Sequence, residues 1–304
     1  MGGRFGGAAD TITTPTRRIV LMGGGPENDE ASTLFVEGSA GGDMVVLRAS
    51  GSLTSYPNYF SGVDGTLIPS PLPASVVTVL TDNPQSGNDP ALLCWLAGAE
   101  AVWLAGGDQW NYVGLWPDTV HALLAALTAR GGVVGGTSAG AVVMGEAAFD
   151  ARYGTVTSDE ALADPFVREV SLSYPSFAQP ELSRIYVDSH FMDRSREGRL
   201  LVFLARFLED RGYDSVRGIG LDEGVALVIE GGAFQVLSER GGSAWLYVVE
   251  GPVSISAGTP LSLTNVSRFR LGGGSRGMWP VDLSAFSAQS MHVSDGVVQL
   301  GQPQ

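Results

Sequence analysis

Short apolar segments that end in glycine, each followed by a helical pattern, recur through the first half of the chain. Segments apolar along their whole length, alternating with helices, predict a parallel sheet covered by helices on both faces. In such α/β sheets the ligand site lies at the carboxyl ends of the strands, where these glycine-rich turns fall. The expected strands are residues 18–22, 44–47, 76–80, 102–104 and 132–135, with helices at 89–97 and 118–130.

The second half of the chain has a different pattern of predicted elements. A loop-rich segment, 148–184, leads into a strand at 185–187 and a helix at 196–210. After Gly218, short strands at 225–229, 234–237 and 244–249 are separated by Gly-Gly pairs, which are turn signals typical of hairpins. We therefore predict three parts: a flexible N-terminal arm (1–16), one α/β domain (17–250) and a β-rich C-terminal extension packed on it (251–304).

The segment Gly136-Thr137-Ser138-Ala139-Gly140 lies between an apolar run and a helical pattern. That context favours a nucleophile elbow, in which a tight turn pushes the hydroxyl of Ser138 out of the sheet. The small neighbours would let a carbonyl carbon approach closely. An ordinary strand-to-helix turn is the alternative, because a glycine-rich chain can produce this pentapeptide by chance.

A nucleophilic serine needs a base, and all 18 basic residues are arginine, so a lysine base is excluded. Of the three histidines, His121 falls in an amphipathic helical pattern and His292 in a C-terminal strand pattern, which favours structural roles. His190 follows an apolar strand and remains as the candidate general base. Alternatively, His190 is a polar residue at the end of a strand that is hydrogen-bonded to the backbone.

A carboxylate should orient the imidazole, and the acidic pair Asp222-Glu223 follows another glycine-flanked apolar run. We predict that Glu223 orients the imidazole. Alternatively, the acidic pair belongs to a turn that is simply solvated. An oxyanion hole needs two N–H donors beside the nucleophile. Gly107, in a Gly-Gly turn after residues 102–104, and Ala139 are the candidates.

The composition limits which partners and substrates the chain is expected to bind. The formal net charge of −14 disfavours binding to nucleic acid or to an anionic membrane and favours a cationic or zwitterionic substrate. The single Cys94 lies in an apolar helical pattern, and we expect it to pack in the core. Without a signal-peptide pattern we expect a cytoplasmic protein, with a secreted form that has lost its leader as the alternative. No metal or organic cofactor is implied, and the three histidines are too scattered for a metal site.

Several separated motifs together resemble the cyanophycinase-like serine peptidases of peptidase family S51, which are related to aspartyl dipeptidases. Their order and spacing agree as well, over residues 17–249. The motifs are Gly106-Gly107-Asp108-Gln109, the Ser138 pentapeptide, Asp188-Ser189-His190-Phe191, Arg194, Arg196, Gly198-Arg199-Leu200 and Gly218-Ile219-Gly220-Leu221-Asp222-Glu223.

The resemblance implies a flavodoxin-like core similar to class I glutamine amidotransferases. It also implies cleavage of cyanophycin, which has an aspartate backbone and arginine side chains, to β-aspartyl-arginine dipeptides. Carried over by motif, Ser138 is the nucleophile, His190 the base and Glu223 the acid. The residues implied to bind substrate are Gln109, Asp188, Arg194, Arg196 and Arg199.

The resulting hypothesis is a serine-type hydrolase that attacks aspartyl peptide or isopeptide bonds through an acyl-enzyme. The expected substrate is a peptide or polyamide rich in Asp and Arg. An aspartyl dipeptidase with the same triad and an inactive binding homologue remain as alternatives. Exposed strand edges in the C-terminal part are compatible with a homodimer.

Overall fold

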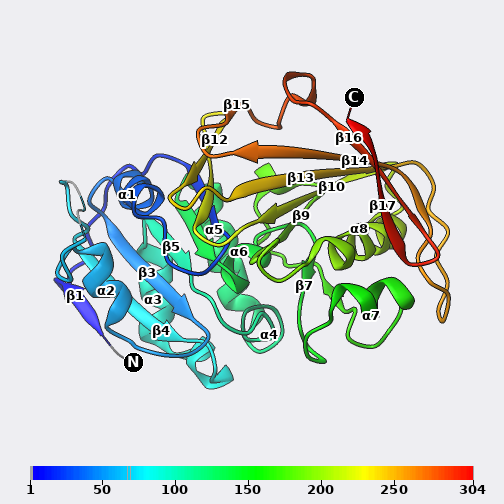
Figure 1. The fold of residues 1–304 in the computed structure, drawn as a ribbon. Coiled ribbons are helices and arrows are strands. Elements are labelled where there is room, and N and C mark those ends of the chain that lie inside the picture. The colour runs from blue at the N-terminus through cyan, green and yellow to red at the C-terminus, as the bar shows by residue number, and fades with distance from the viewer. Residues whose placement is uncertain (1–2, 67, 69, 304) are drawn as a thin grey trace.

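A nine-stranded sheet forms the frame of the computed structural model, which describes residues 3–66, 68 and 70–303 (Figure 1). Five neighbouring strands, β4-β3-β5-β6-β2, run parallel, and strands at both edges run antiparallel to them. This confirms the predicted mostly parallel sheet. In spatial order the strands are β1 (Arg4–Gly6), β4 (Ser75–Leu80), β3 (Asp43–Arg48), β5 (Ala101–Leu104), β6 (Val133–Thr137), β2 (Arg18–Met22), β11 (Val225–Glu230), β12 (Ala233–Ser238) and β15 (Arg276–Met278).

Both faces of this sheet are buried because alternate residues of each strand point to opposite sides. In β2, Val20 and Met22 pack in one cluster with α1 (Asp29–Gly38) and α2 (Ser55–Phe60). Ile19 and Leu21 pack in another cluster, with α3 (Pro90–Gly98) and α5 (Asp118–Ala129). Strands buried on both sides explain the continuous apolar runs in the sequence.

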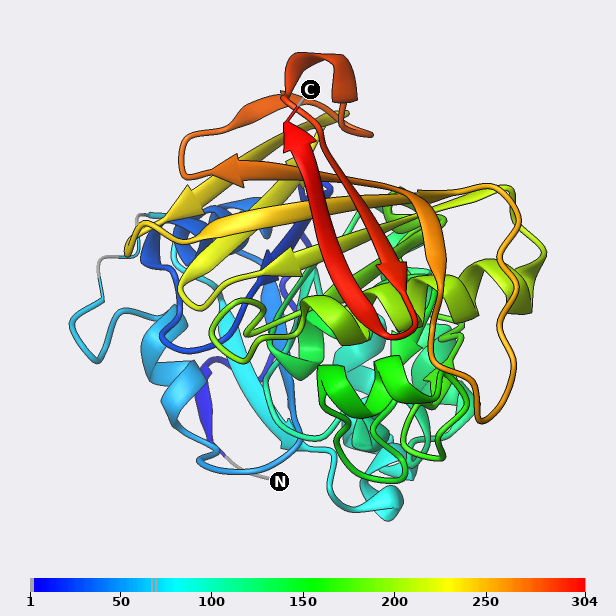
Figure 2. The same ribbon diagram turned by 45° about the vertical axis from the view of Figure 1, so that its right-hand side comes forward.

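A second sheet of six strands lies beside the first and contributes to the same core as α3 and α5. Its other face packs against α8 (Glu197–Arg211), which in turn contacts α7 (Ser158–Ala163). In Figure 2 its yellow and orange strands cross the upper part of the view, and its red strands run down in front of the green helices. The strands in order are β17 (Val297–Pro303), β16 (Gln289–Ser294), β14 (Leu263–Gly272), β13 (Ser243–Glu250), β10 (Ser215–Leu221) and β9 (Ile185–Asp188).

Local sequence signals place the ends of these helices. The side chain of Asn28 accepts a hydrogen bond from the amide of Ala31 and so caps the start of α1. Gly212 ends α8 in the left-handed conformation, with φ of 63°. Four shorter elements follow: the helices α4 (Trp110–Val113) and α6 (Ala139–Val142) and the paired strands β7 (Ala148–Phe149) and β8 (Leu172–Ser173).

Two details differ from expectation. Cys94 is exposed on α3, because Leu92 and Leu96 face the sheet and a residue midway between them points to the opposite side of a helix. The prediction that it packs in the core was wrong. Within the segment expected to be a flexible arm, Arg4–Gly6 forms the edge strand β1, which pairs with β4. Over the residues described, no helix is both long and apolar enough to cross a bilayer.

Candidate active site

Ser138 occupies the sharp turn between β6 and α6, as the sequence predicted. Its backbone lies at φ 52° and ψ −119°, a conformation that a residue with a side chain rarely adopts. Glycines on both sides make this turn possible: a Cβ on Gly140 would overlap the carbonyl oxygen of Leu104. A strained residue held between glycines is the geometry of a nucleophile elbow.

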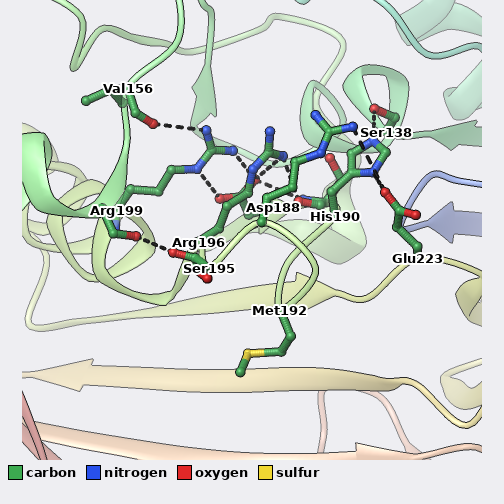
Figure 3. Close-up of polar contacts among 12 residues, drawn as sticks. Ser138, Val156, Asp188, His190, Met192, Ser195, Arg196, Arg199 and Glu223 are labelled. Carbon is green, nitrogen blue, oxygen red and sulfur yellow. Dashed lines mark hydrogen bonds and ion pairs between the residues drawn. The ribbon is translucent and has the colours of Figure 1, made fainter.

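His190 and Glu223 extend a chain of hydrogen bonds from this serine (Figure 3). The Nε2 atom of His190 lies 2.8 Å from Oγ of Ser138, and its Nδ1 atom lies 2.5 Å from Oε1 of Glu223. A carboxylate can only accept, so Nδ1 carries the proton and Nε2 is left to accept from the serine hydroxyl. The arrangement therefore holds the imidazole in the tautomer that a general base requires.

The surroundings of His190 keep its ring neutral. Burial lowers the pKa of His190 below its ordinary value, and the positive charges of Arg194 and Arg196 act in the same direction. The hydrogen bond with Glu223 opposes them without reversing the shift. At neutral pH the imidazole is consequently unprotonated and able to take a proton from Ser138.

The turn after β2 holds the backbone at Ser138, at His190 and next to Glu223, a role that no motif in the sequence indicated. Three successive carbonyls, of Met22, Gly23 and Gly24, accept hydrogen bonds from the amides of Ser138, His190 and Gly224 at 3.0, 2.7 and 3.0 Å. Gly24 also lies flat against the imidazole, so that a Cβ there would overlap the ring. The turn could have been suspected from its place at the carboxyl end of a parallel strand.

A pocket of about 360 Å³ opens in front of Ser138. Gly107, at φ 137°, lies in its wall and exposes its backbone beside the serine. Ala139 is the first residue of α6, and its amide has no acceptor within that helix. A larger cavity, of about 450 Å³, lies near Arg17 and Trp279 and contains none of these groups, so the chemistry places the site in the smaller one.

The adjacent carboxyls Asp222 and Glu223 have separate tasks. Asp222 accepts hydrogen bonds from the amides of Met192 and Ser243, at 3.1 and 2.9 Å, and from the indole of Trp245 at 3.1 Å. It therefore ties the loop after His190 to strand β13. Glu223, one residue later, is turned toward the imidazole instead (Figure 3).

Two of the residues expected to bind substrate are buried against each other, which corrects that expectation. Asp188 is 0% exposed and Arg199 is 2% exposed. The guanidinium of Arg199 donates from Nε to Oδ2 and from Nη2 to Oδ1 of Asp188, at 2.9 and 2.6 Å. This bidentate pair anchors α8 to the end of β9 (Figure 3).

The other expected substrate ligands differ in accessibility. Arg196 is largely buried and donates from Nη1 to the carbonyl of Ser189 at 2.7 Å. The side chain of Arg194 is 54% exposed, with Nη2 4.0 Å from Oε1 of Glu223, so it is the freer cation beside the triad. Gln109 is half-buried at the start of α4, and its substrate role stays a prediction.

Comparison with known proteins gives these positions a family context. The family model described as Peptidase family S51 matches residues 46–237, which contain Ser138, His190 and Glu223. The chain belongs to peptidase family S51. Among solved structures of its fold, a peptidase from an acI-B1 Actinobacterium superposes with a TM-score of 0.56 at 16% identity, covering 88% of this chain and 98% of that one.

Curated relatives of this S51 chain are named cyanophycinase. The protein from Trichormus variabilis is 32% identical over 173 residues, which are 56% of this chain and 49% of that relative. The protein from Geminocystis herdmanii is 30% identical over 198 residues, which are 62% of this chain and 66% of the relative. The chain thus matches about half to two-thirds of the length of these relatives.

The remaining histidines lie away from the S51 site, in the settings their patterns indicated. His121 is buried in α5, where Nε2 lies 2.9 Å from the carbonyl of Tyr112. His292 is on β16, with Nε2 2.9 Å from Oε1 of Gln299. In the part of the chain that the structure describes, no group of three or more His, Cys, Asp or Glu side chains is arranged to hold a metal ion.

Proposed function

We propose that this S51 chain is a serine peptidase that hydrolyses aspartyl peptide or isopeptide bonds through an acyl-enzyme. The single observation that carries the proposal is the continuous hydrogen-bonded chain from the Ser138 hydroxyl through His190 to Glu223. Nucleophile, base and orienting acid are the parts that such a reaction needs, and they are in contact before any substrate binds.

The proposed reaction proceeds in two halves. His190 takes the proton of Ser138 through Nε2 as Oγ attacks the scissile carbonyl carbon, and the amides of Gly107 and Ala139 bind the resulting oxyanion. The C–N bond then breaks, and His190 gives its proton to the leaving amine. A water molecule repeats the sequence on the ester, which releases the acid and restores Ser138. Glu223 stabilises the imidazolium in both halves without taking its proton.

The substrate class is proposed from the relatives and from charge. The curated relatives carry the name of enzymes that degrade cyanophycin, a polyamide of aspartate with arginine side chains. A net charge of −14 on this chain would attract such arginyl groups. The exposed guanidinium of Arg194 beside the triad could pair with a substrate carboxylate. We therefore propose cyanophycin, cleaved to β-aspartyl-arginine, as the substrate.

A serine-directed fluorophosphonate tests the mechanism directly. We expect a single adduct on Ser138, and loss of labelling and hydrolysis in Ser138→Ala and His190→Ala. His292→Ala changes an exposed histidine outside the site and should keep both labelling and hydrolysis. An adduct elsewhere, or none on Ser138, would refute the triad. Hydrolysis of cyanophycin supports the proposed substrate, whereas activity confined to α- or β-aspartyl dipeptides would make the chain a dipeptidase.

A further inference from the structure

A second ionisable group, Glu27, lines the pocket in front of Ser138. It follows the glycine turn after β2, and the same pocket wall contains Thr137 and Tyr56. Its Oε1 atom accepts a hydrogen bond of 2.5 Å from the Tyr56 hydroxyl. Nothing in the proposed mechanism uses this carboxyl, although it shares the cavity with the reacting serine.

The other carboxyl oxygen of Glu27 receives no strong hydrogen bond. Oε2 is buried, and neither it nor the Thr137 hydroxyl makes a hydrogen bond of normal geometry among the residues described. The hydroxyl is near enough to Glu27 to favour its ionised form, and yet both atoms keep an unused lone pair. The Thr137 hydroxyl is thus the group that partners the Glu27 carboxyl on this side, and neither oxygen receives an N–H donor from the residues described.

No neighbouring cation is free to neutralise Glu27. The guanidinium of Arg48 also lines the pocket, but it donates to the carbonyls of Ser50 and Ser52 at 2.6 and 2.9 Å and stacks on the ring of Tyr56. In the described part of the chain no ion pair includes Glu27. The carboxyl therefore has no cation in direct contact, although the charge of Arg48 acts on it from farther away.

The protonation of Glu27 reflects this environment. Burial raises the pKa of Glu27 to about 7, and the charge of Asp29 adds to the rise, while the Tyr56 hydrogen bond and Arg48 oppose it. His190 faces the same pocket and is neutral near this pH. A bound cation would favour the carboxylate, so that binding would release a proton from a site that is half-protonated near pH 7.

We propose that Glu27, with the Thr137 hydroxyl, is the subsite that receives a guanidinium or ammonium group of the substrate beside Ser138. This inference rests on the proposed peptidase function and deepens it, since it names the residue that makes a positive charge necessary for efficient cleavage. A planar guanidinium carries several N–H donors and matches the geometry of a carboxylate. Its neutral counterpart, the urea of citrulline, has the same shape without the charge.

The test compares aspartyl-arginine and aspartyl-citrulline substrates in the wild type and in Glu27→Gln. The wild type should prefer arginine, and the variant should lose roughly tenfold to hundredfold of that preference in kcat/KM, as for a lost charged hydrogen bond. Glu30→Gln removes an exposed carboxylate three residues away and should leave the preference unchanged. An unaltered preference in Glu27→Gln would overturn the inference.

The pH dependence of the arginine preference gives a second readout. The carboxylate binds the cation, so the kcat/KM ratio of arginine to citrulline substrate should rise as pH increases through about 7. Titration of His190 affects both substrates equally and cancels in the ratio. In Glu27→Gln the ratio should not change over this pH range, and a wild-type ratio independent of pH would contradict the proposal.

Failure of the inference can be separated from failure of the proposed function. Fluorophosphonate labelling of Ser138 reports the nucleophile and needs no cation, so Glu27→Gln should label at nearly the wild-type rate. If even the wild type does not label, the peptidase proposal is wrong. Calorimetry can then measure how tightly Ser138→Ala binds the arginine and citrulline substrates. If the preference for arginine is the same in Ser138→Ala and in the double variant Ser138→Ala/Glu27→Gln, the subsite proposal is wrong.

Discussion

The neighbouring residues Asp222 and Glu223 should respond to the same isosteric change in opposite ways. In Glu223→Gln the imidazole loses the carboxylate that fixes its tautomer and stabilises its positive charge, so we expect kcat to fall by about 10²–10⁴ with little change in Tm. In Asp222→Asn a side-chain amide would face donors from Met192, Ser243 and Trp245, which should cost about 1–3 kcal/mol of stability.

Thermal unfolding and the rate of fluorophosphonate labelling measure the two effects separately. A stable but inactive Asp222 variant, or an active but unstable Glu223 variant, would contradict the assignment. The pair also shows what residue type alone cannot reveal. Both are acids in one turn, and their tasks differ because Asp222 faces N–H donors of the fold whereas Glu223 faces the imidazole.

At the scale of elements, the sequence predicted the strands and the turns at their carboxyl ends because apolar runs ending in glycine are local signals. The pentapeptide around Ser138 is also a local signal and predicts the nucleophile. His190 is predicted by elimination among the three histidines. The observed geometry brings both to one edge of the fold. Their function as nucleophile and base remains a prediction for the labelling experiment.

What the sequence could not supply is the direction in which a side chain points in three dimensions. Arg196 and Arg199 are three apart in sequence, as expected for neighbours on a helix, but that spacing does not tell whether they face a ligand or the protein. Arg199 faces inward to Asp188. Glu27 was overlooked for a related reason, since an acid ahead of the helix α1 resembles an ordinary helix start.

The buried pair Asp188–Arg199 allows a test of its structural role. Arg199→Leu leaves the buried charge of Asp188 with only the longer ion pair to Arg196, at 3.5 Å, and should destabilise the fold by about 3 kcal/mol in urea denaturation. Adding Asp188→Leu removes that charge, so the double variant should recover most of the stability. If Arg199 instead bound substrate, the double variant would fold but show a strongly raised KM, with kcat little changed.

On the scale of the whole molecule, the three proposed catalytic side chains come from two sheets. Ser138 follows β6 of the nine-stranded sheet, whereas His190 follows β9 of the six-stranded one. Glu223 lies where the chain passes from β10 in the second sheet to β11 in the first. Both sheets contribute side chains to one hydrophobic cluster, which keeps the serine and the imidazole in register.

This division makes the enzyme a candidate for reconstitution from two halves. Gly154 lies in an exposed loop between Ser138 and His190, where a break in the backbone should be tolerated. Fragments 1–154 and 155–304 should each be inert toward a fluorophosphonate when expressed alone and should regain labelling when expressed together. Reaction of the first fragment by itself would show that its serine needs no help from the other half.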